Sequence, residues 1–361
     1  MDAGLPPCLS SLVCNLKIRR VLTIVASFAV TAVFLALALY PVNFAQLGQA
    51  FASADYRLVV VAGCFTFAGY VLRTKRWQRF LAPSKKIPVV RLFPVLVIGF
   101  ALNNLLPGRP GEFARPYALG RRESLSKTLG FATVVVERVA DGVALIGILL
   151  LTLGAFIPLH LRLPEVAEGI AALATAVFGV ALAGLLFLLL RESLALAMFH
   201  RLEHWMPHGL ATRLEKMLGS FTIGLHSLKS PNDVLAIAVL SLAVWACEGT
   251  AYFLVLSAFG EFDFLPERMV AAAFMMVLIN LGIMIPAAPG GLGPFEAAAV
   301  FALGAFGVNE TTAASVALTA HAVQYLIITG LGLLFIWREG ISLAQARPDD
   351  DESPSIVQSD G

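Results

Sequence analysis

The sequence predicts an all-α, polytopic integral membrane protein with about six full spans and two re-entrant hairpins, arranged as a possible inverted repeat. Hydrophobic residues make up 58% of the 361 residues and charged residues only 14%, whereas charged residues make up about 25% of soluble domains. Long apolar runs recur along the whole chain. One Pro/Gly-rich break interrupts these runs in each half, at 105–112 and at 286–296.

The first apolar run, 21–40, follows a basic tail, 1–20. A cleaved signal peptide has an apolar region of only about 7 to 15 residues, so a retained span is the better interpretation and cleavage the weaker one. The remaining apolar runs lie at 57–73, 89–107, 128–157, 167–190, 233–259, 268–288, 295–307 and 311–337.

Basic residues predict which connections face the cytoplasm. Short cytoplasmic loops are enriched in Lys and Arg, and the stretches 73–91, 108–127 and 191–230 are all rich in them. The connections 41–56, 158–167 and 260–267 are poor in basic residues, so we expect them outside. This assignment predicts a multi-pass protein of the bacterial cytoplasmic (inner) membrane, with both termini in the cytoplasm.

The run 89–107 has basic stretches on both sides, so it cannot cross the membrane fully if both are cytoplasmic. A re-entrant hairpin resolves this conflict: the chain enters from the cytoplasm, breaks at Pro107–Gly111 and returns. The runs 268–288 and 295–307 form the matching hairpin from outside. Helix breaks inside lipid are tolerated where they face protein or a water-filled cavity, and paired breaks are typical of transport sites. The alternative is that all nine runs cross and the first break is an ordinary loop.

We expect one transmembrane domain over 21–340. It includes a cytoplasmic amphipathic helix near 210–228, where apolar residues recur at helical spacing. This helix is either a lid or headgroup contact, or a plain connector resting on the bilayer. The acidic segment 341–361 has the composition of a disordered tail.

No pattern predicts a metal, a cofactor or a nucleic acid. None of the four cysteines has CxxC or metal-ligand spacing. The Gly-rich stretch 290–293 lacks the Lys-Ser/Thr of a nucleotide-binding loop.

Three ionisable residues lie together in an apolar run. Such residues cost about 2.5 to 3.5 kcal/mol on insertion scales, so they are candidate functional sites. Glu137 and Asp141 share one helix face, with Arg138 near either carboxylate. A substrate site and a structural ion pair between two helices explain this group equally well.

Two further spans carry isolated polar residues. Glu248 is alone in its apolar run, so it needs a cation or a proton. His321 and Gln324 lie one helical turn apart on the last run. A packing role with satisfied hydrogen bonds is as good an explanation of His321 as a ligand role.

The broken segments have chemistry of their own. A new helix is expected after Pro107 and after Gly293, and the free N–H groups of a helix N-terminus attract anions such as phosphate. Arg109 and Arg115 could hold a phosphate through two parallel hydrogen bonds. Acidic residues in the first turns of the two new helices, at positions 112 and 296, are either ligands or simple caps.

The ordered motifs of this chain resemble the transmembrane region of the lysylphosphatidylglycerol synthases. They are Asn103-Asn104-Leu105-Leu106-Pro107, Gly111-Glu112, Arg115, Glu137-Arg138-Val139-Ala140-Asp141 and Pro289-Gly290-Gly291-Leu292-Gly293-Pro294-Phe295-Glu296. The resemblance covers nearly the whole chain. It implies lipid handling, because in the full-length synthases this region looks like the flippase part. The aminoacyl-transferring domain has no counterpart after the last span, so we expect transport more than enzyme activity.

The sequence thus predicts a lipid flippase or transporter that binds a polar or charged headgroup. The alternatives are a membrane-embedded lipid-modifying transferase and a scaffold for a separately encoded lipid-synthesis enzyme. The predicted substrate-binding residues are Asn103, Arg109, Glu112, Arg115, Glu137, Arg138, Asp141, Glu248, Gly290, Gly291, Glu296 and His321.

Overall fold

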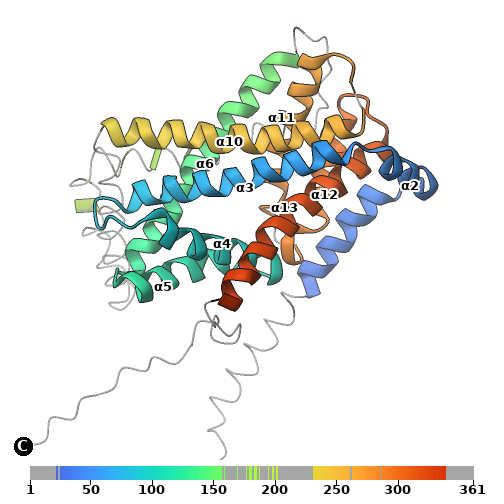
Figure 1. Cartoon of the computed structure of the whole chain (residues 1–361). Helices are drawn as coiled ribbons and strands as arrows, with labels where there is room; N and C mark the ends of the chain where they lie inside the picture. Colours follow the sequence, from blue (N-terminus) through green and yellow to red (C-terminus); the bar gives the residue numbers. More distant parts are fainter. Residues whose placement is uncertain are drawn as a thin grey trace, which may run out of the picture.

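The computed structural model describes residues 25–156, 231–260, 262–285 and 287–338, with isolated positions at 22, 158 and between 169 and 201. Every regular element in these residues is helical (Figure 1). After the helix Val25–Leu39, the elements are α2 (Phe44–Ser53), α3 (Tyr56–Leu81), α4 (Val89–Leu105), α5 (Gly111–Glu123), α6 (Lys127–Phe156), α10 (Pro231–Ala258), α11 (Leu265–Gly282), the 3-10 helix η3 (Pro289–Gly291), α12 (Pro294–Gly304) and α13 (Glu310–Arg338).

The helices confirm a polytopic membrane protein. In the described part, α3, α6, α10, α11 and α13 are long and apolar enough to cross a membrane, and Val25–Leu39 with α2 forms a further candidate bent by 79°. The amphipathic helix 210–228, the tails 1–20 and 341–361 and, apart from isolated positions, the predicted span 167–190 lie outside the described residues.

The first break lies where the sequence predicts it. At 17 residues, α4 is short for a full crossing, and α5 folds back along it. Gly99 and Gly111 make this return possible, because a Cβ on Gly111 would lie only 1.7 Å from the Gly99 carbonyl oxygen. Asn103 closes the turn, since its Oδ1 accepts a hydrogen bond from the Gly111 N–H at 2.8 Å. Gly108 and Arg109 between the helices have positive φ angles.

The second break repeats this design between α11 and α12. A Cβ on Gly282 would lie 3.1 Å from the Pro294 carbonyl oxygen. The two hairpins therefore close at the same sequence separation, 99 to 111 and 282 to 294. Gly290 and Gly293 have positive φ angles, which a glycine adopts without strain.

The two halves run in opposite directions. Helices α3 and α10 lie side by side (Figure 1). They are antiparallel, because the Asp55 N–H donates to the Ala258 carbonyl at 2.9 Å at one end and Arg79 pairs with Asp233 at 3.5 Å at the other. The helix that follows each hairpin also packs against the hairpin of the other half: α13 packs on α4, and α6 packs on α11. This exchange is what an inverted repeat requires.

The two hairpins enter from opposite ends of the α3–α10 pair. Lys85, before α4, pairs with Glu123 at the end of α5 at 2.8 Å. At the other end of the molecule, the ring of Phe262, before α11, contacts the ring of Phe306, after α12, at 6.1 Å. The tips of both hairpins therefore point toward the middle of the structure.

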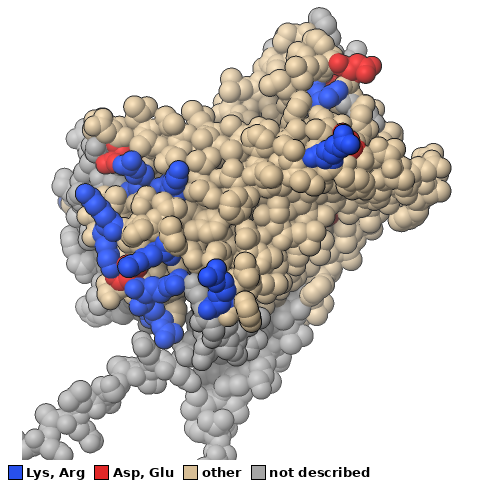
Figure 2. All heavy atoms as spheres, in the orientation of Figure 1, with Lys and Arg blue, Asp and Glu red and all other residues tan. Residues whose placement is uncertain are grey.

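Exposed basic side chains gather at the end of the molecule where α5 lies (Figure 2). They are Lys75, Arg79, Lys85, Lys86, Arg91, Arg121, Arg122 and Lys127. Their position at one end follows the expected distribution of Lys and Arg in membrane proteins.

Two of the predicted loops are largely helical, which corrects the sequence-based boundaries. Helix α3 continues to Leu81, so Arg73 and Arg76 lie within it and are buried, with exposed fractions of 8% and 0%. Helix α5 likewise occupies most of 108–127, and Arg115 is buried at 3%. The helices extend beyond the apolar runs. They can hold these buried guanidiniums because carboxylates on neighbouring helices compensate the positive charges.

Candidate functional site

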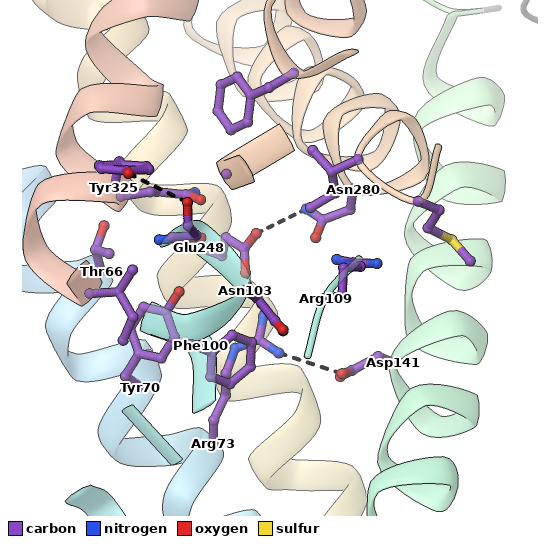
Figure 3. Close-up of a pocket in the computed structure, with 18 of the residues that line it drawn as sticks. Thr66, Tyr70, Arg73, Phe100, Asn103, Arg109, Asp141, Glu248, Asn280 and Tyr325 are labelled. Carbon is purple, nitrogen blue, oxygen red and sulfur yellow. Dashed lines mark hydrogen bonds and ion pairs between the residues drawn. The ribbon is translucent and has the colours of Figure 1, made fainter. Parts of the chain in front are cut away.

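A cavity of about 330 Å³ lies where the two hairpin tips meet (Figure 3). The tips are joined through α13: the Tyr325 hydroxyl donates to the Asn104 carbonyl at 3.4 Å, and Gly290 lies against the same Tyr325 ring. Residues of both hairpins and of α3, α6, α10 and α13 line the space. The cavity is therefore shared by the two halves of the repeat.

Arg73 of α3 connects the two carboxylate-bearing spans. Its guanidinium lies 2.7 Å from Glu248 on α10 and 3.5 Å from Asp141 on α6. Asn280 of α11 donates to the other Glu248 oxygen at 2.9 Å. Figure 3 shows these four side chains around the cavity. Glu248 thus has the cation that the sequence predicts it to need, together with an amide donor.

A second layer of charge lies behind Arg73. Arg76 is fully buried and pairs with Asp141 at 2.7 Å, while Arg138 pairs with the same carboxylate at 3.5 Å. Arg138 has a side chain 37% exposed and lines the cavity. Asp141 is therefore shared among three guanidiniums, those of Arg73, Arg76 and Arg138.

Glu137 and Arg115 form the innermost pair. Their charged atoms are 2.8 Å apart, and their side chains are 0% and 3% exposed. The Arg115 guanidinium also lies 4.5 Å from the centre of the Trp77 ring, a favourable cation–π distance. Neither residue lines the cavity, so they position α5 against α6 rather than contact a ligand.

Arg109 differs from the other arginines of the cavity. It lies in the first break, in a left-handed backbone conformation with φ 54°, and it lines the cavity (Figure 3). Among the described residues, no carboxylate forms an ion pair with its guanidinium, and Glu112 is an acidic neighbour whose charge acts on it. A cation in this position is available for an anionic ligand.

Glu296 and His321 join the second hairpin to α13. One Glu296 oxygen accepts the Gly293 N–H at 2.7 Å, so this carboxylate caps α12. Its other oxygen lies 2.6 Å from His321 Nδ1. The remaining ring nitrogen of His321 lies 3.1 Å from the Gly290 carbonyl oxygen.

Eight of the twelve predicted binding residues line the cavity. They are Asn103, Arg109, Glu112, Arg138, Asp141, Glu248, Gly290 and His321. The other four, Arg115, Glu137, Gly291 and Glu296, do not line it. Three of those four act through neighbours as positioning residues, while Gly291 shapes the turn with its φ of 74°.

Sequence reasoning missed several residues of the cavity. Arg73 lines the cavity and Arg76 lies behind it. The sequence predicts both in a cytoplasmic loop, although Arg138 alone cannot compensate the three carboxylates Glu137, Asp141 and Glu248. Asn280 carries a signal that could have found it, since it is the single amide in an apolar run just before the second break. Trp245 lines the cavity, and its buried indole N–H has no hydrogen-bond partner among the described residues.

The described residues also bear on metal binding. No group of three or more His, Cys, Asp or Glu side chains in that part of the chain lies close enough together to hold a metal ion. The polar side chains that line the cavity carry guanidinium, carboxylate, amide, hydroxyl, indole and imidazole groups.

Comparisons with known proteins match this architecture. The family model described as the lysylphosphatidylglycerol synthase transmembrane region matches residues 24–332. A UPF0104 membrane protein of Methanothermobacter thermautotrophicus is 26% identical over 319 residues, which cover 84% of this chain and 92% of that protein. Another UPF0104 membrane protein, PH1989 of Pyrococcus horikoshii, is 26% identical over 78% of this chain and 87% of its own length.

A third relative is longer. The Haloferax volcanii protein named glycosyltransferase AglD is 26% identical over 88% of this chain, and the match spans 54% of that protein. These three relatives are archaeal. No solved structure matches the chain. Because the family match covers most of the sequence, this chain belongs to the family of the lysylphosphatidylglycerol synthase transmembrane region.

Proposed function

We propose that this protein moves a polar lipid between membrane leaflets and binds an anionic part of the headgroup, such as a phosphate, through Arg109. The observation that carries the proposal is the Arg109 guanidinium, which faces a cavity between two hairpin tips without a carboxylate partner in the described part of the chain. A phospholipid, an aminoacylated lipid or another polar lipid fits this chemistry.

The size of the cavity supports a headgroup as the bound part. At about 330 Å³, the space is at the lower end of ligand pockets, which are about 300 to 1,000 Å³. A headgroup fits such a volume, whereas two acyl chains do not. The chains of the lipid would stay in the bilayer while the headgroup passes through the protein.

The charge pattern supports a headgroup that also carries a cation. Glu112 lines the cavity three residues after Arg109, and the described residues form no ion pair with it. Asp141 and Glu248, by contrast, are held by arginines. Glu112 is therefore the carboxylate available for an amino group of a zwitterionic or aminoacylated lipid.

The orientation follows from the surface charge. The end that carries the exposed basic residues (Figure 2) would face the cytoplasmic side of a cytoplasmic membrane. A lipid-synthesis enzyme encoded separately would then supply the substrate at that surface.

A membrane-embedded lipid-modifying transferase is the second candidate, favoured by the name of the longer relative, a glycosyltransferase. Such an enzyme needs a general base. Glu248 and Asp141 already contact guanidiniums at 2.7 Å, so neither carboxylate is free to reach a substrate. Glu112 would have to take this role, so lipid conversion that depends on Glu112 is the signature of this alternative.

Reconstitution in vesicles tests the proposal. Fluorescent phospholipids report movement between leaflets, and mass spectrometry of the same vesicles reports conversion. We expect Arg109→Gln to slow lipid movement by about 10- to 150-fold, the value of a charged hydrogen bond of about 1.5 to 3 kcal/mol, and Arg109→Lys to restore part of the rate.

The control is Arg91→Gln, at a side chain that is 70% exposed on the basic end. It should leave lipid movement unchanged. Equal rates for Arg109→Gln and the unaltered protein would refute the assignment of Arg109. Conversion of the lipid, lost in Glu112→Gln, would replace transport with the transferase.

A further inference from the structure

His321 lies between two hydrogen-bond acceptors. Its Nδ1 is 2.6 Å from a Glu296 carboxylate oxygen, and its Nε2 is 3.1 Å from the Gly290 carbonyl oxygen. A carbonyl oxygen and an ionised carboxylate only accept, and a neutral imidazole has a single N–H to donate. Both contacts are satisfied together only when the His321–Glu296 pair holds one additional proton.

We propose that His321 and Glu296 form a proton-binding site, and that the bound proton holds the second break against α13. The proposal rests on the proposed function, because it makes the proton the ion that is coupled to lipid movement. Nothing in the site of Arg109 requires it, so the two proposals can fail separately.

The surroundings keep the imidazole in place when it loses its proton. The Phe295 ring stacks on His321 with centroids 4.2 Å apart, and His321 is only 7% exposed. Glu296 cannot turn away either, since its second oxygen accepts the Gly293 N–H. A change of protonation must therefore alter the contact between His321 Nε2 and the Gly290 carbonyl oxygen.

Loss of the proton has a defined consequence. The Nδ1–H bond to the carboxylate is the stronger one, because charge-assisted hydrogen bonds are roughly twice as strong as neutral ones. Nε2 then presents a lone pair to the Gly290 carbonyl oxygen, and the attraction at 3.1 Å becomes repulsion. Gly290 lies next to the Tyr325 ring, and a Cβ added to Gly290 would lie 3.5 Å from the Asn104 carbonyl oxygen. Its release would separate the two hairpin tips.

The other titratable groups that face the site have partners of their own or lie on other walls. Tyr325 is one turn away on α13, with ring centroids 6.1 Å apart. Tyr252 of α10 accepts a hydrogen bond from Gln324 at 2.7 Å. The charged side chains that share the cavity with His321 are Arg73, Arg109, Glu112, Arg138, Asp141 and Glu248.

Hydrogen–deuterium exchange tests the site without any transport. In the purified protein, the backbone of 287–293 should be protected about tenfold or more at low pH relative to neutral pH, after correction for intrinsic exchange. His321→Gln should abolish this pH dependence. Tyr325→Phe is the matched control. It removes a hydroxyl contact at the same junction but leaves the His321–Glu296 pair intact, so the pH dependence should persist.

Vesicles with an imposed pH gradient test the coupling. The gradient should change the rate of lipid movement in the unaltered protein and in Tyr325→Phe but have no effect in His321→Gln. Lipid movement that ignores the gradient, together with pH-independent exchange at 287–293, overturns the proton site and leaves the transport proposal standing. Retained pH-dependent exchange in a protein that moves no lipid would overturn the transport proposal instead.

Discussion

Glu137→Gln is the substitution whose cost the structure defines best. The Glu137 side chain is 0% exposed and lies 2.8 Å from Arg115, 3.1 Å from Arg138 and 3.7 Å from Arg76. Glutamine keeps the shape of the side chain but replaces one accepting oxygen with a donating NH2 group. One guanidinium then faces a donor, and the buried positive charge of Arg115 loses its counterion.

Breaking a buried pair in this way costs about 3 to 5 kcal/mol. Since each 1.4 kcal/mol is a factor of ten, the ratio of folded to unfolded protein should fall by roughly 100- to 5,000-fold. Arg115 has little freedom to escape, because it is 3% exposed and packs over the Trp77 ring at 4.5 Å. We expect a large fall in thermal stability, measured by intrinsic fluorescence in detergent.

Glu123→Gln provides the matched control. Glu123 is also a paired, largely buried carboxylate, but its partners Lys85 and Arg91 are 43% and 70% exposed. Pairs with exposed partners contribute about 0 to 1 kcal/mol, so stability should barely change. Equal stability of Glu137→Gln and Glu123→Gln would show that the inner charges are solvated and refute the reasoning. Arg115→Met added to Glu137→Gln should recover part of the loss, because it removes the uncompensated charge.

Three further predictions concern helix packing, the first hairpin turn and the cavity. Gly332→Ala should lower the stability of the protein, measured by thermal melting in detergent, by about 1 to 3 kcal/mol, because its Cβ would lie 2.2 Å from a methyl group of α4. Gly330→Ala is the control on the same helix: nothing lies within 4 Å of its Cβ, so the change should be neutral or slightly stabilising. Asn103→Leu should cost about 1 to 3 kcal/mol, since it removes the acceptor of the first N–H of α5, and Asn103→Asp should cost less in the same assay. Asn280→Leu leaves one Glu248 oxygen without its amide donor, so lipid movement in vesicles should slow by about tenfold while the melting temperature changes little. An unchanged rate would show that Asn280 has no part in lipid movement.

Part of the candidate site was readable from the sequence. Glu137, Arg138 and Asp141 stand out because charges in an apolar run are costly, and Pro107 and Gly290 stand out because they break helices inside such runs. These features are local, so composition and spacing are enough to find them. The helix breaks, together with the distribution of Lys and Arg in the flanking loops, predict the two hairpins and their entry from opposite sides.

The roles of these residues were not readable. Glu137 is a structural ion-pair partner of Arg115. Asp141 lines the cavity, and its role toward a substrate stays a prediction. The sequence left Glu296 open between cap and ligand, and the structure makes it both a cap of α12 and the partner of His321. A side chain with two acceptor atoms can serve two partners, which spacing alone does not predict.

The sequence by itself determined the membrane class, the all-helical fold, the two broken segments and the family, since these depend on hydropathy and on motifs along the chain. Only the tertiary structure decided that Arg73 and Arg76 are buried counterions, because their partners Asp141 and Glu248 lie at least 65 positions away from them in the sequence. It also decided that Arg109 faces the cavity without a carboxylate partner in the described residues. Whether a buried charge is compensated depends on which helices pack together, and that is a property of the folded chain rather than of any segment.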